Sequence, residues 1–73
     1  MSKFILVTGA GTGIGRSIAE TLSNQGYALI LCGRNLNRLE ETKINLKNPS
    51  NHSTHSCDIR KAGDVQSVLK KHN

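Results

Sequence analysis

The residues of this 73-residue chain that are best suited to chemistry are the glycines of Thr8–Gly15, which reads Thr-Gly-Ala-Gly-Thr-Gly-Ile-Gly. They directly follow Phe4–Val7, an unbroken apolar run that is typical of a buried strand. A strand that passes through such a turn into a helix leaves the first N–H groups of that helix unpaired, at the positive end of its dipole. Glycines also let the backbone approach a ligand without a Cβ in the way. The segment therefore predicts a phosphate-binding turn.

The spacing of the glycines distinguishes between the known phosphate-binding loops. A Walker loop needs a glycine, four residues and then Gly-Lys, but Ile14 and Arg16 stand at the fifth positions after Gly9 and Gly11. The usual dinucleotide fingerprint, G-x-G-x-x-G, also fails, because Ile14 occupies its last place. The spacing that fits is G-x-x-x-G-x-G, starting at Gly9.

Thr8, Gly9, Gly13, Ile14 and Gly15 complete the pattern T-G-x-x-x-G-I-G, which resembles the signature of the short-chain dehydrogenase/reductase family. The extended branch of that family has glycine at position 12, where this chain has threonine, so the resemblance is to the standard-length branch. It implies a Rossmann-type fold that binds a nicotinamide dinucleotide.

The resemblance also gives each residue of the turn a role. Gly9 is expected to permit the turn, Gly13 to let the backbone approach the pyrophosphate, and Gly15 to bring the helix close to the sheet. Thr12 and Ile14 are expected to offer backbone N–H groups to the phosphates.

Gly33 and Arg34 indicate which nicotinamide dinucleotide is bound. The acid that holds the adenosine ribose is expected about 20 residues beyond the glycines, at the end of the second strand. Gly33 occupies that place, so no carboxylate repels a 2′-phosphate, and Arg34 follows as a planar, permanently charged donor. Similar family members with arginine here usually prefer NADP(H), so we predict NADP rather than NAD. Asn35 either adds a polar contact or caps the next helix.

Asp58 and Ile59 form the next match to the family, whose members use an Asp-aliphatic pair after the third strand to hold the adenine. The resemblance implies that the Asp58 carboxylate accepts from the adenine amino group while the adjacent backbone meets a ring nitrogen. The alternative is an aspartate that stabilises a turn or caps a helix.

Alternating strands and helices are predicted to position these residues. The predicted strands are two apolar runs and one weakly apolar segment: Lys3–Thr8, Tyr27–Cys32 and His52–Cys57. The first predicted helix begins at Thr12 or Gly13 and ends at Gly26. The second begins at the Asn35 N-cap and ends at about Leu46, and the third runs from near Asp64 to the end of the chain. This β-α-β-α-β-α order predicts an α/β fold, a Rossmann-type parallel sheet with flanking helices that is a portion of a doubly wound fold. The polar third strand is expected at a sheet edge.

Each predicted helix carries apolar residues at three- and four-residue spacing, which should pack it onto the sheet. These residues are Ile14, Ile18, Ala19 and Leu22 in the first helix, Leu36, Leu39 and Leu46 in the second, where Thr42 contributes partly, and Val65, Val68, Leu69 and His72 in the third.

The composition argues against several other functions. The net charge is +5, but the ten Lys and Arg residues are dispersed and only one Tyr and one Phe are available to stack on bases, so we predict no nucleic-acid partner. No run approaches the ~18 apolar residues of a membrane span and no signal peptide is visible, so a cytoplasmic protein is expected. Cys32 and Cys57 form no C-x-x-C and are expected to be buried and reduced. His52 and His55, three apart in a strand, face opposite sides and suggest no metal site.

The family's catalytic residues, a Ser and a Tyr-x-x-x-Lys motif, have no counterpart here, since the single tyrosine, Tyr27, has Leu31 four residues later. We therefore assign no catalytic residue. We predict that residues 1–73 are the N-terminal part of one dinucleotide-binding domain. Its longer parent would be an NADP(H)-dependent oxidoreductase that interconverts a small-molecule carbonyl and an alcohol by hydride transfer, as a homo-oligomer. The alternative is a non-catalytic nucleotide-binding module or a truncated product.

Overall fold

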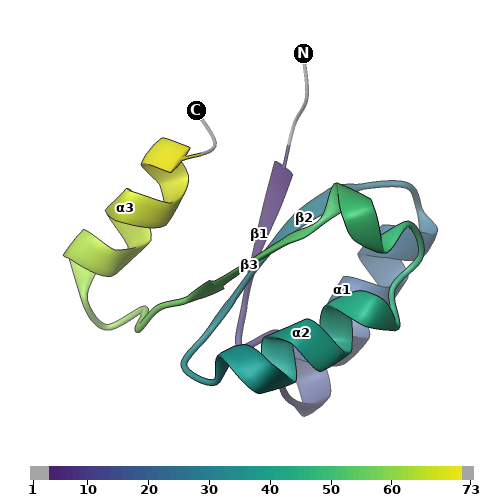
Figure 1. The fold of residues 1–73 in the computed structure, drawn as a ribbon, viewed down its shortest axis with the longest axis horizontal. Coiled ribbons are helices and arrows are strands. Elements are labelled where there is room, and N and C mark those ends of the chain that lie inside the picture. The colour runs from purple at the N-terminus through teal and green to yellow at the C-terminus, as the bar shows by residue number, and fades with distance from the viewer. Residues whose placement is uncertain (1–3, 72–73) are drawn as a thin grey trace.

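The structure, a computed structural model, describes residues 4–71, so the predicted positions Lys3 and His72 lie outside the described residues. Three parallel strands form one sheet in the order β1-β2-β3. The elements in chain order are β1 (Phe4–Thr8), α1 (Gly13–Asn24), β2 (Ala28–Gly33), α2 (Leu36–Ile44), the short 3-10 helix η1 (Pro49–Asn51), β3 (Ser53–Ser56) and α3 (Ala62–Lys71). The alternating α/β architecture with a parallel sheet is confirmed (Figure 1).

β2 lies in the middle of the sheet because its residues are apolar on both faces. Leu29, Ile30, Leu31 and Cys32 are all buried. Successive residues of a strand point to opposite faces, so Leu29 and Leu31 enter one core cluster and Ile30 and Cys32 enter another. A strand covered on both faces is what a continuous apolar run predicts.

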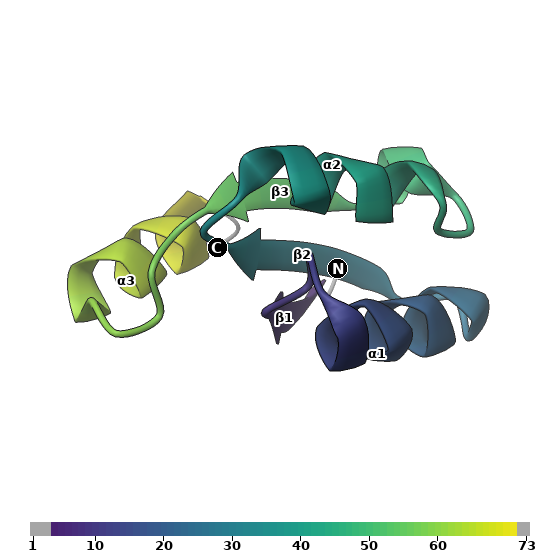
Figure 2. The same ribbon diagram turned by 90° about the horizontal axis from the view of Figure 1, so that it is seen from below.

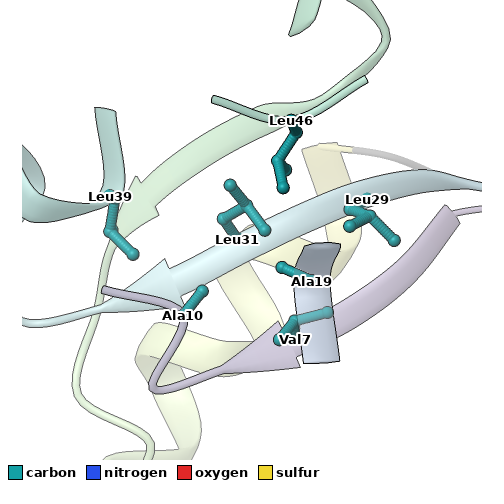
Figure 3. Close-up of a cluster of buried hydrophobic side chains, with 7 residues drawn as sticks. All are labelled: Val7, Ala10, Ala19, Leu29, Leu31, Leu39 and Leu46. Carbon is teal, nitrogen blue, oxygen red and sulfur yellow. The ribbon is translucent and has the colours of Figure 1, made fainter. Parts of the chain in front are cut away.

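α1 and α2 cover the same face of the sheet. Their contributions, Ala19 from α1 and Leu39 from α2, are fully buried against Leu29 and Leu31. Figure 3 shows this cluster, which contains Val7, Ala10, Ala19, Leu29, Leu31, Leu39 and Leu46. The two crossovers therefore bring the starts of α1 and α2 to the same edge of the sheet, at the carboxyl ends of β1 and β2 (Figure 1).

α3 packs on the opposite face, apart from α1 and α2 (Figure 2). Val68 of α3 is buried with Ile30, Cys32 and Cys57, and Phe4 and Leu6 border this second cluster. Burial and the neighbouring Cys57 thiol raise the pKa of Cys32 to about 12. At neutral pH Cys32 is therefore a protonated, unreactive thiol.

The predicted signals for the two ends of α1 and the start of α2 are confirmed. α1 begins at Gly13, and Gly26 follows its end with a φ of 93°. Asn35 caps α2, since its Oδ1 accepts a hydrogen bond from the Arg38 amide at 3.3 Å.

Several predicted boundaries differ from the structure by one or two residues. β2 runs from Ala28 to Gly33 rather than from Tyr27 to Cys32. α2 ends at Ile44 instead of Leu46, because the next amides bond three residues back and tighten the last turn. α3 begins at Ala62 instead of Asp64, because the Lys61 carbonyl oxygen already accepts from the Asp64 amide at 3.1 Å and the Val65 amide at 3.4 Å.

β3 lies at a sheet edge, as its polar sequence predicted. The structure assigns it to Ser53–Ser56, and the preceding His52 has a separate, structural role. The His52 ring is buried, its Nδ1 accepts from the Leu29 amide at 3.1 Å, and its Nε2 lies 2.8 Å from the Lys47 carbonyl oxygen. Both ring nitrogens are thus satisfied by the backbone when Nε2 carries the hydrogen.

The predicted apolar stripe of α1 is only half correct in its packing. Ala19 is fully buried and Leu22 packs against the core, but Ile14 is 82% exposed and Ile18 is 47% exposed. Both positions lack cover because the described sheet ends at β1 and nothing in residues 4–71 packs over this part of the helix.

Among residues 4–71, none of the helices combines the length and the apolar character that a membrane span requires.

Candidate functional site

The glycine turn between β1 and α1 is held by backbone hydrogen bonds at its two ends. The Ala10 amide donates to the Cys32 carbonyl oxygen at 3.2 Å, and the Thr12 amide donates to the Gly9 carbonyl oxygen at 3.3 Å. Gly9 has a φ of 63°, in the left-handed region that favours glycine, so its predicted role in permitting the turn is confirmed.

Gly15 lies directly on the backbone of this turn. A Cβ built on Gly15 would lie 2.1 Å from the Gly9 carbonyl oxygen and 2.5 Å from the Gly9 carbonyl carbon. No side chain fits in that space, so the first turn of α1 can approach the end of β1 this closely only with glycine here. The packing role predicted for Gly15 is confirmed.

The first amides of α1 are open. Within residues 4–71, the N–H groups of Gly11, Gly13, Ile14 and Gly15 donate no hydrogen bond, and Arg16 is the first to bond back along the helix, to the Thr12 carbonyl oxygen at 2.9 Å. The Thr12 side chain does not cap the helix, and no acidic residue lies in its first turn. Open amides at the positive end of a helix attract an anion.

A cavity of about 330 Å³ connects this turn to the start of α2. Its wall is formed by the turn, the end of β2 and the first turn of α2, through Gly9, Gly11, Thr12, Gly33, Arg34, Asn35, Arg38 and Leu39. The structure thus brings together Gly9, Thr12, Arg34 and Asn35 as the sequence predicted. Arg38 was missed, although its place in the first turn of the predicted helix, three residues after the Asn35 cap, is a signal that could have found it.

A second cavity, of about 300 Å³, continues from the first toward the end of β3. The two share Gly9, Gly33 and Arg34, and the second adds Cys57, Asp58, Ile59 and Arg60. Asp58 and Ile59 therefore line the same cavity as Arg34, at the carboxyl ends of the strands. The part played by Arg60 was not predicted.

Arg60 holds the Asp58 carboxylate in place. Oδ1 of Asp58 accepts from the Arg60 amide at 2.9 Å and from Nε at 3.0 Å, and Oδ2 accepts from Nη2 at 2.9 Å. The hydrogen bonds from the Arg60 guanidinium and backbone amide, with a smaller contribution from Arg34, lower the pKa of Asp58 well below its usual range. The carboxylate is therefore ionised at every physiological pH. The bond from Asp58 to the amide two residues on is also the aspartate-stabilised turn that was the alternative prediction.

Arg16 is directed toward α2 rather than toward the open amides. Its Nε donates to the Thr42 hydroxyl at 3.0 Å, and its Nη2 lies 3.7 Å from Oε2 of Glu41. Tyr27 precedes β2, whose first residue pairs with Phe4 at the amino end of β1. Tyr27 therefore lies at the amino ends of the strands, whereas the two cavities lie at the carboxyl ends.

The arrangement suits a ligand with anionic groups in two places and a further group that reaches the second cavity, beside Asp58 and Ile59. The open amides offer one anion site, and the two arginines of the first cavity offer another. Within residues 4–71 no group of three or more His, Cys, Asp or Glu side chains gathers in a way that could hold a metal ion.

Comparisons with known proteins agree with this geometry. The family model described as short chain dehydrogenase matches residues 3–73. An uncharacterized oxidoreductase of Staphylococcus epidermidis is 40% identical over 68 residues, covering 93% of this chain and 29% of that protein. The 3-oxoacyl-(acyl-carrier-protein) reductase of Mus musculus is 37% identical over 71 residues, covering 97% of this chain and 29% of that protein. The chain spans 29% of the length of both these curated relatives.

A solved structure shows the same architecture. The alcohol dehydrogenase of the archaeon Thermococcus sibiricus, complexed with 5-hydroxy-NADP, superposes with a TM-score of 0.84 at 36% identity. The match covers 99% of this chain and 32% of that one.

Proposed function

Since the chain belongs to the short chain dehydrogenase family of oxidoreductases, we propose that it binds NADP(H) and is the N-terminal part of an enzyme that interconverts a carbonyl and an alcohol. The observation that carries this proposal is the continuity of three features at one sheet edge. These are the open amides of the glycine turn, the arginine-lined cavity and the cavity beside Asp58.

The residues present fit the adenosine half of the dinucleotide. The amides of Gly13, Ile14 and Gly15 are free to receive the pyrophosphate, and Gly9 and Thr12 complete that turn. In the second cavity, Asp58 and the backbone at Ile59 would hold the adenine. The Asp58 carboxylate is already ordered and ionised by Arg60, so it is a fixed acceptor for the adenine amino group.

The proposed preference for NADP over NAD rests on what surrounds the ribose position. Gly33 supplies no carboxylate there, and its backbone lines both cavities. Arg34 lies beside it, and in the part of the chain that the structure covers it forms no ion pair, so it is available to a 2′-phosphate. That the similar Thermococcus protein was solved with 5-hydroxy-NADP supports the same choice.

When bound, the cofactor supplies the hydride chemistry, and the chain's own residues bind and orient it. The sequence analysis identified no catalytic residue in this chain, and Tyr27 lies at the amino ends of the strands, away from the cavities. We propose that the catalytic side chains and the contacts to the substrate belong to a remaining part of the domain. The exposed side chains of Ile14 and Ile18 on α1 support further packing there.

Titration of the chain with the two reduced dinucleotides tests this proposal. We expect NADPH to bind at least about tenfold more tightly than NADH, because one charge-assisted contact to the 2′-phosphate contributes about 1.5–3 kcal/mol. Calorimetry or the fluorescence of the bound nicotinamide measures both affinities. Reduced nicotinamide mononucleotide, which lacks the adenosine half, is the control and should bind far more weakly than either. Equal affinities for NADPH and NADH would contradict the proposed preference.

A further inference from the structure

We propose that Arg38 is a second cationic contact for the 2′-phosphate of the dinucleotide, and that Thr42 is the positioning residue that holds it against the glycine turn. This inference rests on the proposed function, since it assigns further residues to the same site.

The pairing of the arginines separates the structural ones from those available to a ligand. The chain has four arginines, and two of them have carboxylate partners: Arg16 with Glu41 and Arg60 with Asp58. Arg34 and Arg38 have no carboxylate within ion-pair distance in residues 4–71. These two are the arginines that line the first cavity.

Asp58 in the second cavity interacts electrostatically with Arg34 but is hydrogen-bonded to Arg60, and no negative charge lies in the wall of the first cavity. Its lining contains no acidic residue, and the first turn of α2 has none either. Two cations beside a helix N-terminus raise the local positive potential, and a phosphate with nearly two negative charges lowers it. A ligand without that phosphate leaves both arginines facing water.

The cap of α2 holds the backbone of Arg38, and the Arg38 Cβ lies close to the glycine turn. The Arg38 amide donates to the Asn35 cap at 3.3 Å, and a Cβ built on Gly11 would lie 3.0 Å from the Arg38 Cβ. The turn that is proposed to hold the pyrophosphate therefore touches the base of the Arg38 side chain.

Thr42 completes the connection from inside the fold. Thr42 is 1% exposed, and its hydroxyl lies 2.9 Å from the Ala10 carbonyl oxygen and 3.1 Å from the Arg38 carbonyl oxygen. The same hydroxyl accepts from Arg16 Nε at 3.0 Å. One buried hydroxyl thus joins the glycine turn, α1 and the turn of α2 that carries Arg38.

The test compares adenosine 2′,5′-bisphosphate with adenosine 5′-monophosphate, which lacks only the 2′-phosphate. For Arg38→Met, calorimetry should show affinity for the bisphosphate reduced about tenfold, the effect of roughly 1.4 kcal/mol, and affinity for the monophosphate changed less than about twofold. Arg38→Lys should keep part of the preference, since it retains the charge without the planar fork. Lys47→Met is the matched control, an exposed charge beyond the other end of α2, and should change neither affinity.

Thr42→Val and Thr42→Ser test the positioning role. Valine keeps the volume and removes the hydroxyl, so the preference for the bisphosphate should fall; serine keeps the hydroxyl and should preserve it. Far-UV circular dichroism shows whether each variant is folded, and the serine variant tests the role even if the valine variant is not.

The possible results separate this inference from the proposed function. If Arg38→Met keeps the full preference for the bisphosphate, or weakens both ligands equally, the inference is overturned while the proposed function stands. If the unaltered chain binds the two ligands equally, the proposed function fails first.

Discussion

Replacing Gly15 with alanine is expected to destabilise the fold by about 3 kcal/mol or more and to abolish dinucleotide binding, since a methyl group there overpacks the interior. The added Cβ would lie 2.1 Å from the Gly9 carbonyl oxygen, and the atoms it meets are backbone atoms of the turn. They cannot move aside as the end of a flexible side chain can. Relief of the contact would separate α1 from β1 and displace the open amides.

Urea denaturation followed by circular dichroism measures the loss of stability, and nucleotide titration measures the loss of binding. Gly63→Ala is the matched control, because Gly63 lies in α3 and a Cβ there would meet nothing within 4 Å. It should stabilise the chain by about 0.5–1 kcal/mol, the difference in helix propensity between glycine and alanine. A Gly15→Ala chain as stable as the unaltered one would show that the turn and helix are not packed in this way.

The double substitution Gly33→Asp with Arg34→Leu is expected to reverse the order of the two cofactors. The aspartate would accept hydrogen bonds from the ribose hydroxyls and repel a 2′-phosphate, and the leucine would remove the phosphate donor. A Cβ at Gly33, the last residue of β2, would lie 3.2 Å from Cδ2 of the buried Leu39, so the Leu39 side chain must shift by a few tenths of an ångström to admit the aspartate. NADPH affinity should fall by about two orders of magnitude, given about 1.5–3 kcal/mol for the lost contact and added like-charge repulsion.

Equilibrium titration of NADPH and NADH against the double variant measures the reversal. Arg34→Leu alone is the informative comparison, because it should lose NADPH affinity without gaining affinity for NADH. A double variant that still prefers NADPH would place the 2′-phosphate away from Arg34.

The order of strands and helices and the glycine turn were predictable because they depend on residues close together in the sequence. The apolar run of Phe4–Val7, the glycines that follow and the Asn35 cap each act within one or two turns of chain. Gly15 was assignable for the same reason, since its neighbour in space, Gly9, is also near in sequence. The position of Arg34 near the glycine turn was predictable because few residues separate that turn from the end of the second strand.

The residues that depend on contacts between separate elements were not predictable. Thr42 appeared only as a partial member of an apolar face, and its link to Ala10 arises when α2 packs beside the turn. His52 carried no sign that its ring accepts from the Leu29 amide. The apolar spacing in α1 predicted that Ile14 and Ile18 are packed, but both are exposed. Such spacing identifies the apolar face of a helix and carries no information about which element covers that face.

The most direct test of the central claim is to follow the backbone amide signals of the isotopically labelled chain while NADP⁺ is added. We predict that the largest shifts occur at Gly11, Gly13, Ile14 and Gly15, the amides without an internal acceptor, together with the guanidinium signal of Arg34. Shifts at Asp58 and Ile59 should accompany them. Saturable shifts that leave the glycine turn unchanged and concentrate on α3 or the far end of α2 would contradict the claim that this turn binds the pyrophosphate.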